Sequence, residues 1–129
     1  MIEISTPDAP QPAGHYAQAI VHNGLVYVSG QLPVDPTTGE KRLESIEEQA
    51  EQALKNVAAI LKAAGSDLDH VLKTTVYVSD ISLWGRVNAV YATFFDDHRP
   101  ARAVVPTREL HYGFQVEIEA IAAIPETSL

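Results

Sequence analysis

The segment Ser45–Gly65 constrains the fold more than any other, because its apolar residues recur every three to four positions. This period places them on one stripe of a helix, formed by Ile46, Ala50, Ala53, Leu54, Val57, Ile60 and Leu61. Ser45 and Glu48 have the spacing of a capping box, and Gly65 can end the helix in the left-handed region without a Cβ penalty. A helix with one apolar stripe packs against another layer, which the rest of the chain has to supply.

Residues before this helix predict the first part of that layer. Ala17–His22 and Leu25–Ser29 flank Asn23-Gly24, a pair typical of the type I′ turn of a hairpin. Gly30 is expected to end the second of these strands. Ahead of the hairpin, the proline-rich segment Thr6–Gly14 predicts an extended arm.

Residues after the helix predict the remainder. Strand patterns occupy Val71–Ser79, Ala101–Val105 and Gln115–Ala123. The first of these places on one face Leu72, Thr74, Val76 and Val78, and on the other Lys73, Thr75 and Tyr77. A second helix runs from a cap at Asp80 or Ser82 to Phe95, with inward residues Trp84, Val87, Val90, Tyr91 and Phe94. Pro106 cannot donate to a ladder, so the strand before it ends, bulges or lies at an edge there.

This order of elements predicts an α+β fold with the helices packed on one face of a sheet. The 129 residues suit one domain, 1–129. The chain has no cysteine, which excludes disulfides, thiolate metal sites and a cysteine nucleophile. Neither a signal peptide nor a membrane-spanning stretch is expected, so a cytoplasmic protein is predicted. The net charge of −8 disfavours binding to nucleic acid.

The second face of the sheet is mixed in character. Gln115, Glu117, Glu119 and Ile121 alternate with the apolar positions of the last strand, and four residues from other strands are expected beside them: Tyr27, Ser29, Thr75 and Tyr77. Antiparallel sheets often leave one face in water. A face rich in tyrosine, threonine and β-branched residues is also typical of an oligomer interface. The pattern alone does not decide between the two.

Motifs for chemistry are sparse. The five histidines lie at unrelated spacings, so no metal site is predicted from them. Arg102 stands in a strand of small and apolar residues and therefore needs an anionic partner. That partner is either Glu117 or Glu119 in an internal ion pair, or the carboxylate of a small ligand, which a guanidinium binds in a bidentate manner. Glu117 in a half-buried site could orient or deprotonate a water molecule.

The chain resembles the reactive-intermediate deaminase family (RidA, YjgF/UK114). The resemblance runs in order from about Ala9 to Ala123 and is carried by Ser29-Gly30-Gln31, Pro100-Ala101-Arg102 and Glu117-Ile118-Glu119-Ala120, with Tyr16, Asn56, Gly65 and Asn88 between them. It implies a chorismate-mutase-like fold, a mixed sheet of about six strands with two helices on one face. It also implies a homotrimer whose sheets form a central barrel, with sites between subunits. This favours the interface reading of the mixed face.

The family's activity implies hydrolysis of enamine and imine intermediates, of the 2-aminoacrylate and 2-iminopropanoate type, to a 2-oxo acid and ammonia without a cofactor. By the resemblance, Arg102 binds the substrate carboxylate and Glu117 lies by the attacking water. The other site positions are Tyr16, Ser29, Gly30, Asn88 and Val104. Many members have cysteine where this chain has Val104, a position thought to act through its backbone. The turn His111–Phe114 replaces a common proline-containing turn at the cleft, which leaves the choice of substrate open.

Two other functions are compatible with the sequence. The protein could bind or hydrolyse a different small carboxylate or carbonyl metabolite, as the changed turn suggests. It could instead act through other macromolecules, as a chaperone or as a translation inhibitor with ribonuclease activity. The acidic charge opposes RNA binding, and no pair of general bases for RNA cleavage is evident. An imine deaminase is therefore the first expectation.

Overall fold

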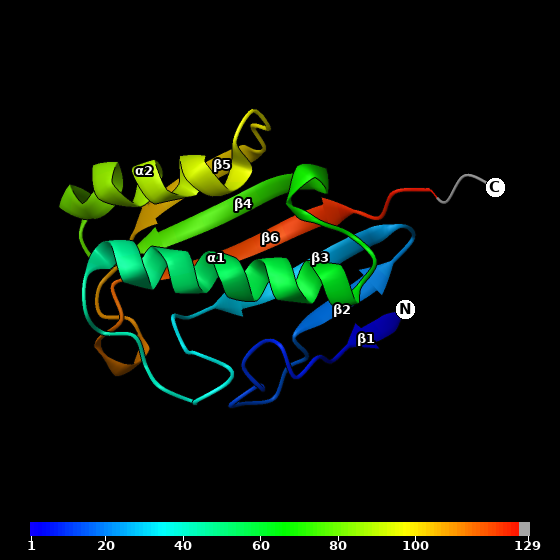
Figure 1. Ribbon diagram of the computed structural model, residues 1–129, viewed down its shortest axis with the longest axis horizontal. Coiled ribbons are helices and arrows are strands. Elements are labelled where there is room, and N and C mark those ends of the chain that lie inside the picture. Colours follow the sequence, from blue (N-terminus) through cyan, green and yellow to red (C-terminus); the bar gives the residue numbers. More distant parts are fainter. Residues whose placement is uncertain (127–129) are drawn as a thin grey trace.

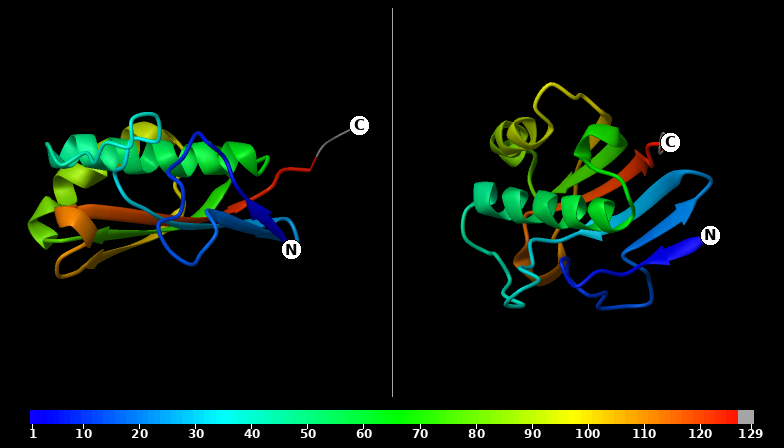
Figure 2. Two further views of the ribbon diagram at one scale, coloured as in Figure 1. Left: turned by 90° about the horizontal axis from the view of Figure 1, so that it is seen from below. Right: turned by 45° about the vertical axis from the view of Figure 1, so that its right-hand side comes forward.

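The computed structural model describes residues 1–126 as one mixed six-stranded sheet covered on one face by two helices (Figures 1 and 2). The helices are α1 (Ile46–Ala63) and α2 (Trp84–Phe95). The strands are β1 (Ile2–Ile4), β2 (Ala19–His22), β3 (Leu25–Gln31), β4 (Val71–Val78), β5 (Ala101–Pro106) and β6 (Val116–Ala123). The predicted α+β class is confirmed.

The strand order is β1-β2-β3-β6-β4-β5, so the last strand in the sequence lies in the middle of the sheet. Only β4 and β5 pair in parallel within the described residues, and α2 provides the crossover between them. β5 lies at one edge and ends at Pro106, as the missing N–H of proline requires. β1, at the other edge, is missed by the sequence patterns because three residues are too few to show a period.

The hairpin and α1 form as the sequence predicts. Asn23 and Gly24 both have positive φ, 50° and 77°, as a type I′ turn requires. At the start of α1, the Ser45 hydroxyl accepts a hydrogen bond of 3.1 Å from the Glu48 N–H. At its end, Gly65 has φ 85°.

Within residues 1–126, neither α1 nor α2 is long and apolar enough to cross a membrane.

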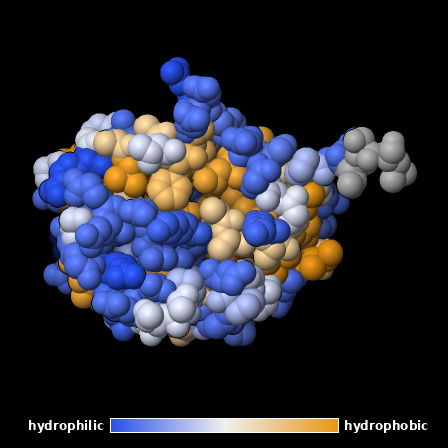
Figure 3. Space-filling model, viewed as in Figure 1, coloured by the Kyte–Doolittle hydropathy of each residue, from blue (hydrophilic) through white to orange (hydrophobic). Residues whose placement is uncertain are grey.

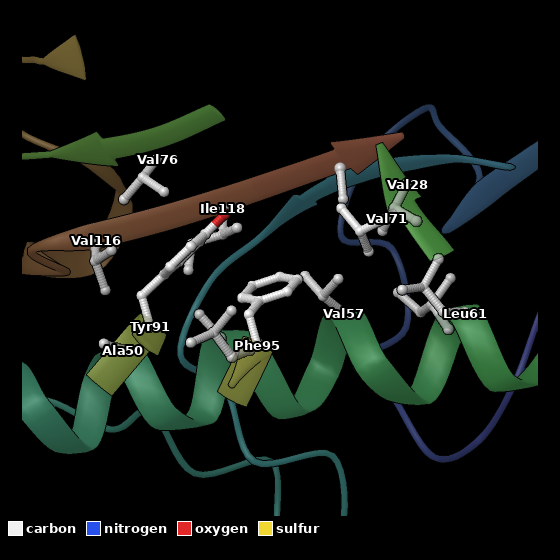
Figure 4. Packing of buried hydrophobic residues seen from close by; sticks show 14 of the residues in the cluster. Val28, Ala50, Val57, Leu61, Val71, Val76, Tyr91, Phe95, Val116 and Ile118 are labelled. Carbon is white, nitrogen blue, oxygen red and sulfur yellow. The ribbon is translucent and has the colours of Figure 1, made fainter. Parts of the chain in front are cut away.

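The core lies between the helices and the sheet (Figure 4). The whole predicted stripe of α1 is buried there, and alternate residues of β6 meet it: Val116, Ile118, Ala120 and Ala122. From α2, Val87, Tyr91 and Phe95 are buried. Trp84 and Phe94, which the sequence places inward, are only partly buried. Figure 3 shows hydrophobic residues gathered in the band between the two helices, whereas the N-terminal half of α1 is hydrophilic on its outer side.

Two sequence predictions need correction. Leu72 was expected to face inward, but it is 49% exposed, and Val71 is buried instead. The pairing of β4 with β6 shifts register between Val71 and Lys73, so an irregularity turns Leu72 outward. Gly30 was expected to end its strand, but β3 continues to Gln31 through a second register shift.

Candidate active site

Arg102 lies on the helix side of the sheet, at the edge strand β5. It pairs in register with the buried Thr74, so both side chains point toward α2. Its Nη1 donates a hydrogen bond of 2.9 Å to Oδ1 of Asn88. The guanidinium also lies 4.6 Å from the ring centroid of Trp84 and 4.7 Å from that of Tyr91. Three residues of α2 at i, i+4 and i+7 therefore fix the plane of the guanidinium.

The internal ion pair considered for Arg102 is not formed. No carboxylate of residues 1–126 lies within 4.0 Å of its guanidinium, and the side chain is exposed. A hollow of about 510 Å³ adjoins it, lined also by Asn88, Tyr91 and Arg99. A held but accessible guanidinium beside a hollow is suited to binding a ligand carboxylate.

Glu117 lies on the opposite side of the sheet. It pairs in register with Tyr77 and points to the face that no helix covers. Its carboxylate packs against the backbone of Gly30, where a Cβ would come within 2.5 Å of Oε2 and 3.0 Å of Cδ. The register shift between Val28 and Gln31 brings this stretch of β3 to Glu117. A side chain at position 30 would therefore displace the Glu117 carboxylate from this contact.

Burial raises the pKa of the Glu117 carboxyl above its ordinary value of 4.5. The positive charge of His111 opposes this rise, and the negative charge of Glu119 adds to the pKa. His111 belongs to the turn that the sequence singled out, a short 3-10 segment His111–Gly113. Glu117 is therefore a half-buried carboxyl whose pKa lies above its ordinary value, and a carboxylate of this kind can accept a proton from water.

Ser29 and Tyr16 lie close to Gly30, Ser29 as its neighbour in β3 and Tyr16 across a shared pocket. The Ser29 hydroxyl donates a hydrogen bond of 2.7 Å to the carbonyl of Ala17, which ties the N-terminal arm to β3. Tyr16 is 53% exposed. Its hydroxyl accepts a hydrogen bond of 3.4 Å from the N–H of Ala13. Tyr16 and Gly30 both line a pocket of about 210 Å³.

Val104 is placed differently from the other site positions. It pairs with Val76 and packs partly buried against the core. Its side chain therefore fills the interior, and β5 offers a ligand only the backbone of an edge strand at this position.

The site residues predicted from the sequence fall into two groups that do not meet within one chain. Arg102 and Asn88 lie on the helix side, whereas Glu117 and Gly30 lie on the other side of the same sheet. Sequence reasoning missed the stacking of Trp84 and Tyr91 on Arg102, because an aromatic residue at helical spacing also predicts core. The sequence did contain a signal for this contact: Trp84, Asn88 and Tyr91 have helical spacing, which places all three on one side of α2.

Among residues 1–126, no three histidine, cysteine, aspartate or glutamate side chains lie close enough together to hold a metal ion.

Comparisons of this chain with known families and known proteins agree on one family. Residues 6–124 match the family described as Endoribonuclease L-PSP. A RutC family protein of Sinorhizobium fredii, y4sK, is 50% identical over 96% of this chain and 99% of its own length. A 2-iminobutanoate/2-iminopropanoate deaminase of Rattus norvegicus is 47% identical over 92% of this chain and 87% of its own length.

The fold is also shared with a solved structure. The YjgF gene product of E. coli superposes with a TM-score of 0.92 at 40% identity, covering 97% of this chain and 100% of that one. The chorismate-mutase-like fold expected from the resemblance is thereby confirmed. The chain belongs to the Endoribonuclease L-PSP family, the family of the RidA and YjgF proteins.

Proposed function

We propose that this protein hydrolyses 2-imino acids and their enamine tautomers to 2-oxo acids and ammonia. The observation that carries the proposal is that one sheet presents two groups suited to this reaction, the Arg102 guanidinium and the Glu117 carboxyl. Arg102 is held by Asn88 and has no carboxylate of the described residues within 4.0 Å, and Glu117 is half-buried with a raised pKa. A substrate with a carboxylate and an electrophilic carbon uses both groups. Relatives named 2-iminobutanoate/2-iminopropanoate deaminase act on this class of compound.

The two groups require a second copy of the chain to act together. Because Arg102 and Glu117 lie on opposite faces of the sheet, one ligand reaches both only at a contact between subunits. In the proposed homotrimer, each site takes Arg102 from one copy and Glu117 from the next. This cyclic arrangement gives three equivalent sites. It also covers the face of the sheet that the helices leave open.

The proposed reaction adds water across the C=N bond. Arg102 fixes the substrate carboxylate in two-pronged contact, which places the imine carbon next to Glu117. Glu117 accepts a proton from water as the oxygen bonds to the carbon of the protonated imine, which gives a neutral carbinolamine. The same carboxyl returns this proton to the nitrogen. As the C–N bond breaks and ammonia leaves with the electron pair, Glu117 takes the hydroxyl proton and passes it to the departing ammonia, which leaves a 2-oxo acid. Tyr16, Ser29 and Gly30 shape the pocket beside Glu117, and the backbone at Val104 completes its rim. The proposal includes no cofactor.

The ribonuclease activity in the family's descriptive name is not proposed for this chain. Seventeen acidic residues outnumber nine Lys and Arg, and a phosphate backbone binds through clustered cations.

The proposal is tested by mixing two inactive variants, Arg102→Ala and Glu117→Gln. Each homotrimer lacks one group at every site and is expected to release no ammonia from 2-iminopropanoate generated in situ. The two variants, carrying different affinity tags, are refolded together and the mixed trimers isolated. Any mixed trimer contains one site with both groups intact, so it should show about one third of the wild-type activity per trimer.

As the control, each variant is refolded alone, and the resulting protein should stay inactive. Inactive mixed trimers would show that the site is not shared between copies. Wild-type protein that hydrolyses no imine from a panel of amino acids would overturn the deaminase function itself. A mass near the 14.0 kDa of one chain, measured by light scattering, would overturn the trimer.

A further inference from the structure

The pocket beside Gly30 has one positive charge in its lining. It holds about 210 Å³ between the N-terminal arm, the end of β3 and the turn before β6, and its lining includes Tyr16, Gly30, Leu32, Val34, Lys41 and Tyr112. Lys41 is the one charged residue in that lining, and no aspartate or glutamate belongs to it. In a chain of net charge −8, a lining whose one charge is positive can attract an anionic group.

The structure holds Lys41 in place from both ends. Its backbone forms an antiparallel bridge with Val34, flanked by a hydrogen bond of 2.8 Å from the Arg42 N–H to the Pro33 carbonyl. Its Nζ lies 4.7 Å from the ring centroid of Tyr112. The ammonium is thereby directed over the pocket wall by a cation–π contact.

Lys41 differs from its neighbour in how its charge is used. Arg42 forms an ion pair of 2.7 Å with Asp35, whereas no carboxylate of residues 1–126 lies within 4.0 Å of Lys41. The cation at the pocket thus remains available to a ligand. Leu32 and Val34 give the same pocket apolar walls, which suit a short chain of methylene groups.

The pocket and the Glu117 carboxylate adjoin the same residue, Gly30. Gly30 lines the pocket and also contacts the Glu117 carboxylate. A substrate whose reacting carbon lies at Glu117 therefore has room for its side chain along the Gly30 wall toward Lys41.

We propose that this pocket is the subsite for the substrate side chain and that Lys41 selects side chains ending in a carboxylate. The preferred substrates are then dicarboxylic 2-imino acids, the imines of acidic amino acids. This inference rests on the proposed function. It assigns the second carboxylate to Lys41, because Arg102 is taken by the first.

The test compares two substrates with the same carbon skeleton. 2-Iminoglutarate, from glutamate, ends in a carboxylate, and 2-iminopentanoate, from norvaline, ends in a methyl group. The wild type should have about a tenfold higher kcat/KM for 2-iminoglutarate, the factor typical of one charge-assisted contact. Lys41→Met should abolish this ratio and Lys41→Glu should reverse it. Lys62→Met, which removes the same charge from the last turn of α1, should leave the ratio unchanged.

A binding measurement separates this inference from the proposed function. Calorimetry with the stable product analogues 2-oxoglutarate and 2-oxopentanoate should show the same preference and the same loss in Lys41→Met. If no imine is hydrolysed but this binding preference is present and depends on Lys41, the deaminase proposal fails and the subsite stands. If the wild type has equal kcat/KM for 2-iminopentanoate and 2-iminoglutarate, and Lys41→Met changes neither value, the subsite is overturned while the deaminase stands.

Discussion

The two faces of the central strand β6 show how one sheet serves two purposes. The residues Val116, Ile118, Ala120 and Ala122 are at most 3% exposed beneath the helices. The alternating residues Glu117, Glu119 and Ile121 are half-buried on the open face. Because side chains of a strand alternate, one segment places the core and the candidate site a single residue apart.

The difference between the faces is one of solvation. On the helix side, apolar groups leave water and supply stability. On the open side, Glu117 keeps partial burial, which costs stability when the carboxylate is charged but raises its pKa toward the range useful for catalysis. Stability and activity should therefore respond to different residues of the same strand.

The largest effect is expected from truncating the helix face at Ile118. This side chain is fully buried in the core, so Ile118→Ala leaves a cavity and should lower the free energy of unfolding by about 2–5 kcal/mol. Urea denaturation at fixed protein concentration measures the change. The activity of the folded fraction should be retained. A loss below 1 kcal/mol would show that the two faces do not differ in packing as described.

A change at the adjacent residue, Glu117, should lower activity while leaving stability intact. Glu117→Gln keeps the size of the side chain against Gly30 but removes the base, so imine hydrolysis should fall about a hundredfold or more. The melting temperature near neutral pH should stay unchanged or rise, because a half-buried charge is lost. The control is Glu51→Gln, the same change at an exposed position of α1, which should leave activity unchanged.

The pH dependence of this variant follows from the sign of the pKa shift. The folded chain holds the Glu117 proton more tightly than the unfolded chain, whose carboxyl has the ordinary pKa of about 4.5. The contribution of this group to wild-type stability therefore falls as the pH rises from that value through the raised pKa. The melting temperature of Glu117→Gln relative to wild type should rise over the same interval. Wild-type kcat/KM should decrease as the pH falls through the raised pKa. A relative melting temperature that falls with rising pH would contradict the assignment.

Much of the helix face could be predicted from the sequence. The stripe of α1 and the alternation in β6 have regular periods, and each predicted core residue on them is buried. The prediction failed where the period breaks. Leu72 faces outward because the pairing of β4 with β6 changes register beside it. The order of apolar and polar residues does not reveal such an irregularity.

The candidate site was harder to predict because it depends on distances that no period encodes. Arg102 and Glu117 came from their unusual residue types, but the pattern could not choose between an ion pair and a ligand site. The register of β5 excludes the ion pair, since Arg102 faces the helices with Thr74 while Glu117 and Glu119 face the other side. The contact between Glu117 and Gly30 likewise depends on a register shift in β3, which the sequence shows only as a glycine in a strand.

The smallest expected effect compares two tyrosine hydroxyls, one on each face. Tyr91 OH lies 2.7 Å from the buried Thr74 hydroxyl, whereas Tyr77 OH donates to Glu119 at 2.8 Å on the open face. Tyr91→Phe strands a buried hydroxyl and should cost about 1–3 kcal/mol of unfolding free energy. Tyr77→Phe should cost about 0.5–1 kcal/mol. Glu119 borders a hollow of about 250 Å³, which has room for water to replace the lost donor. Urea titrations of both variants measure the difference. Equal losses of 1–3 kcal/mol would mean that the open face is as dry as the core, and the contrast between the two faces would then lie in their residue types alone.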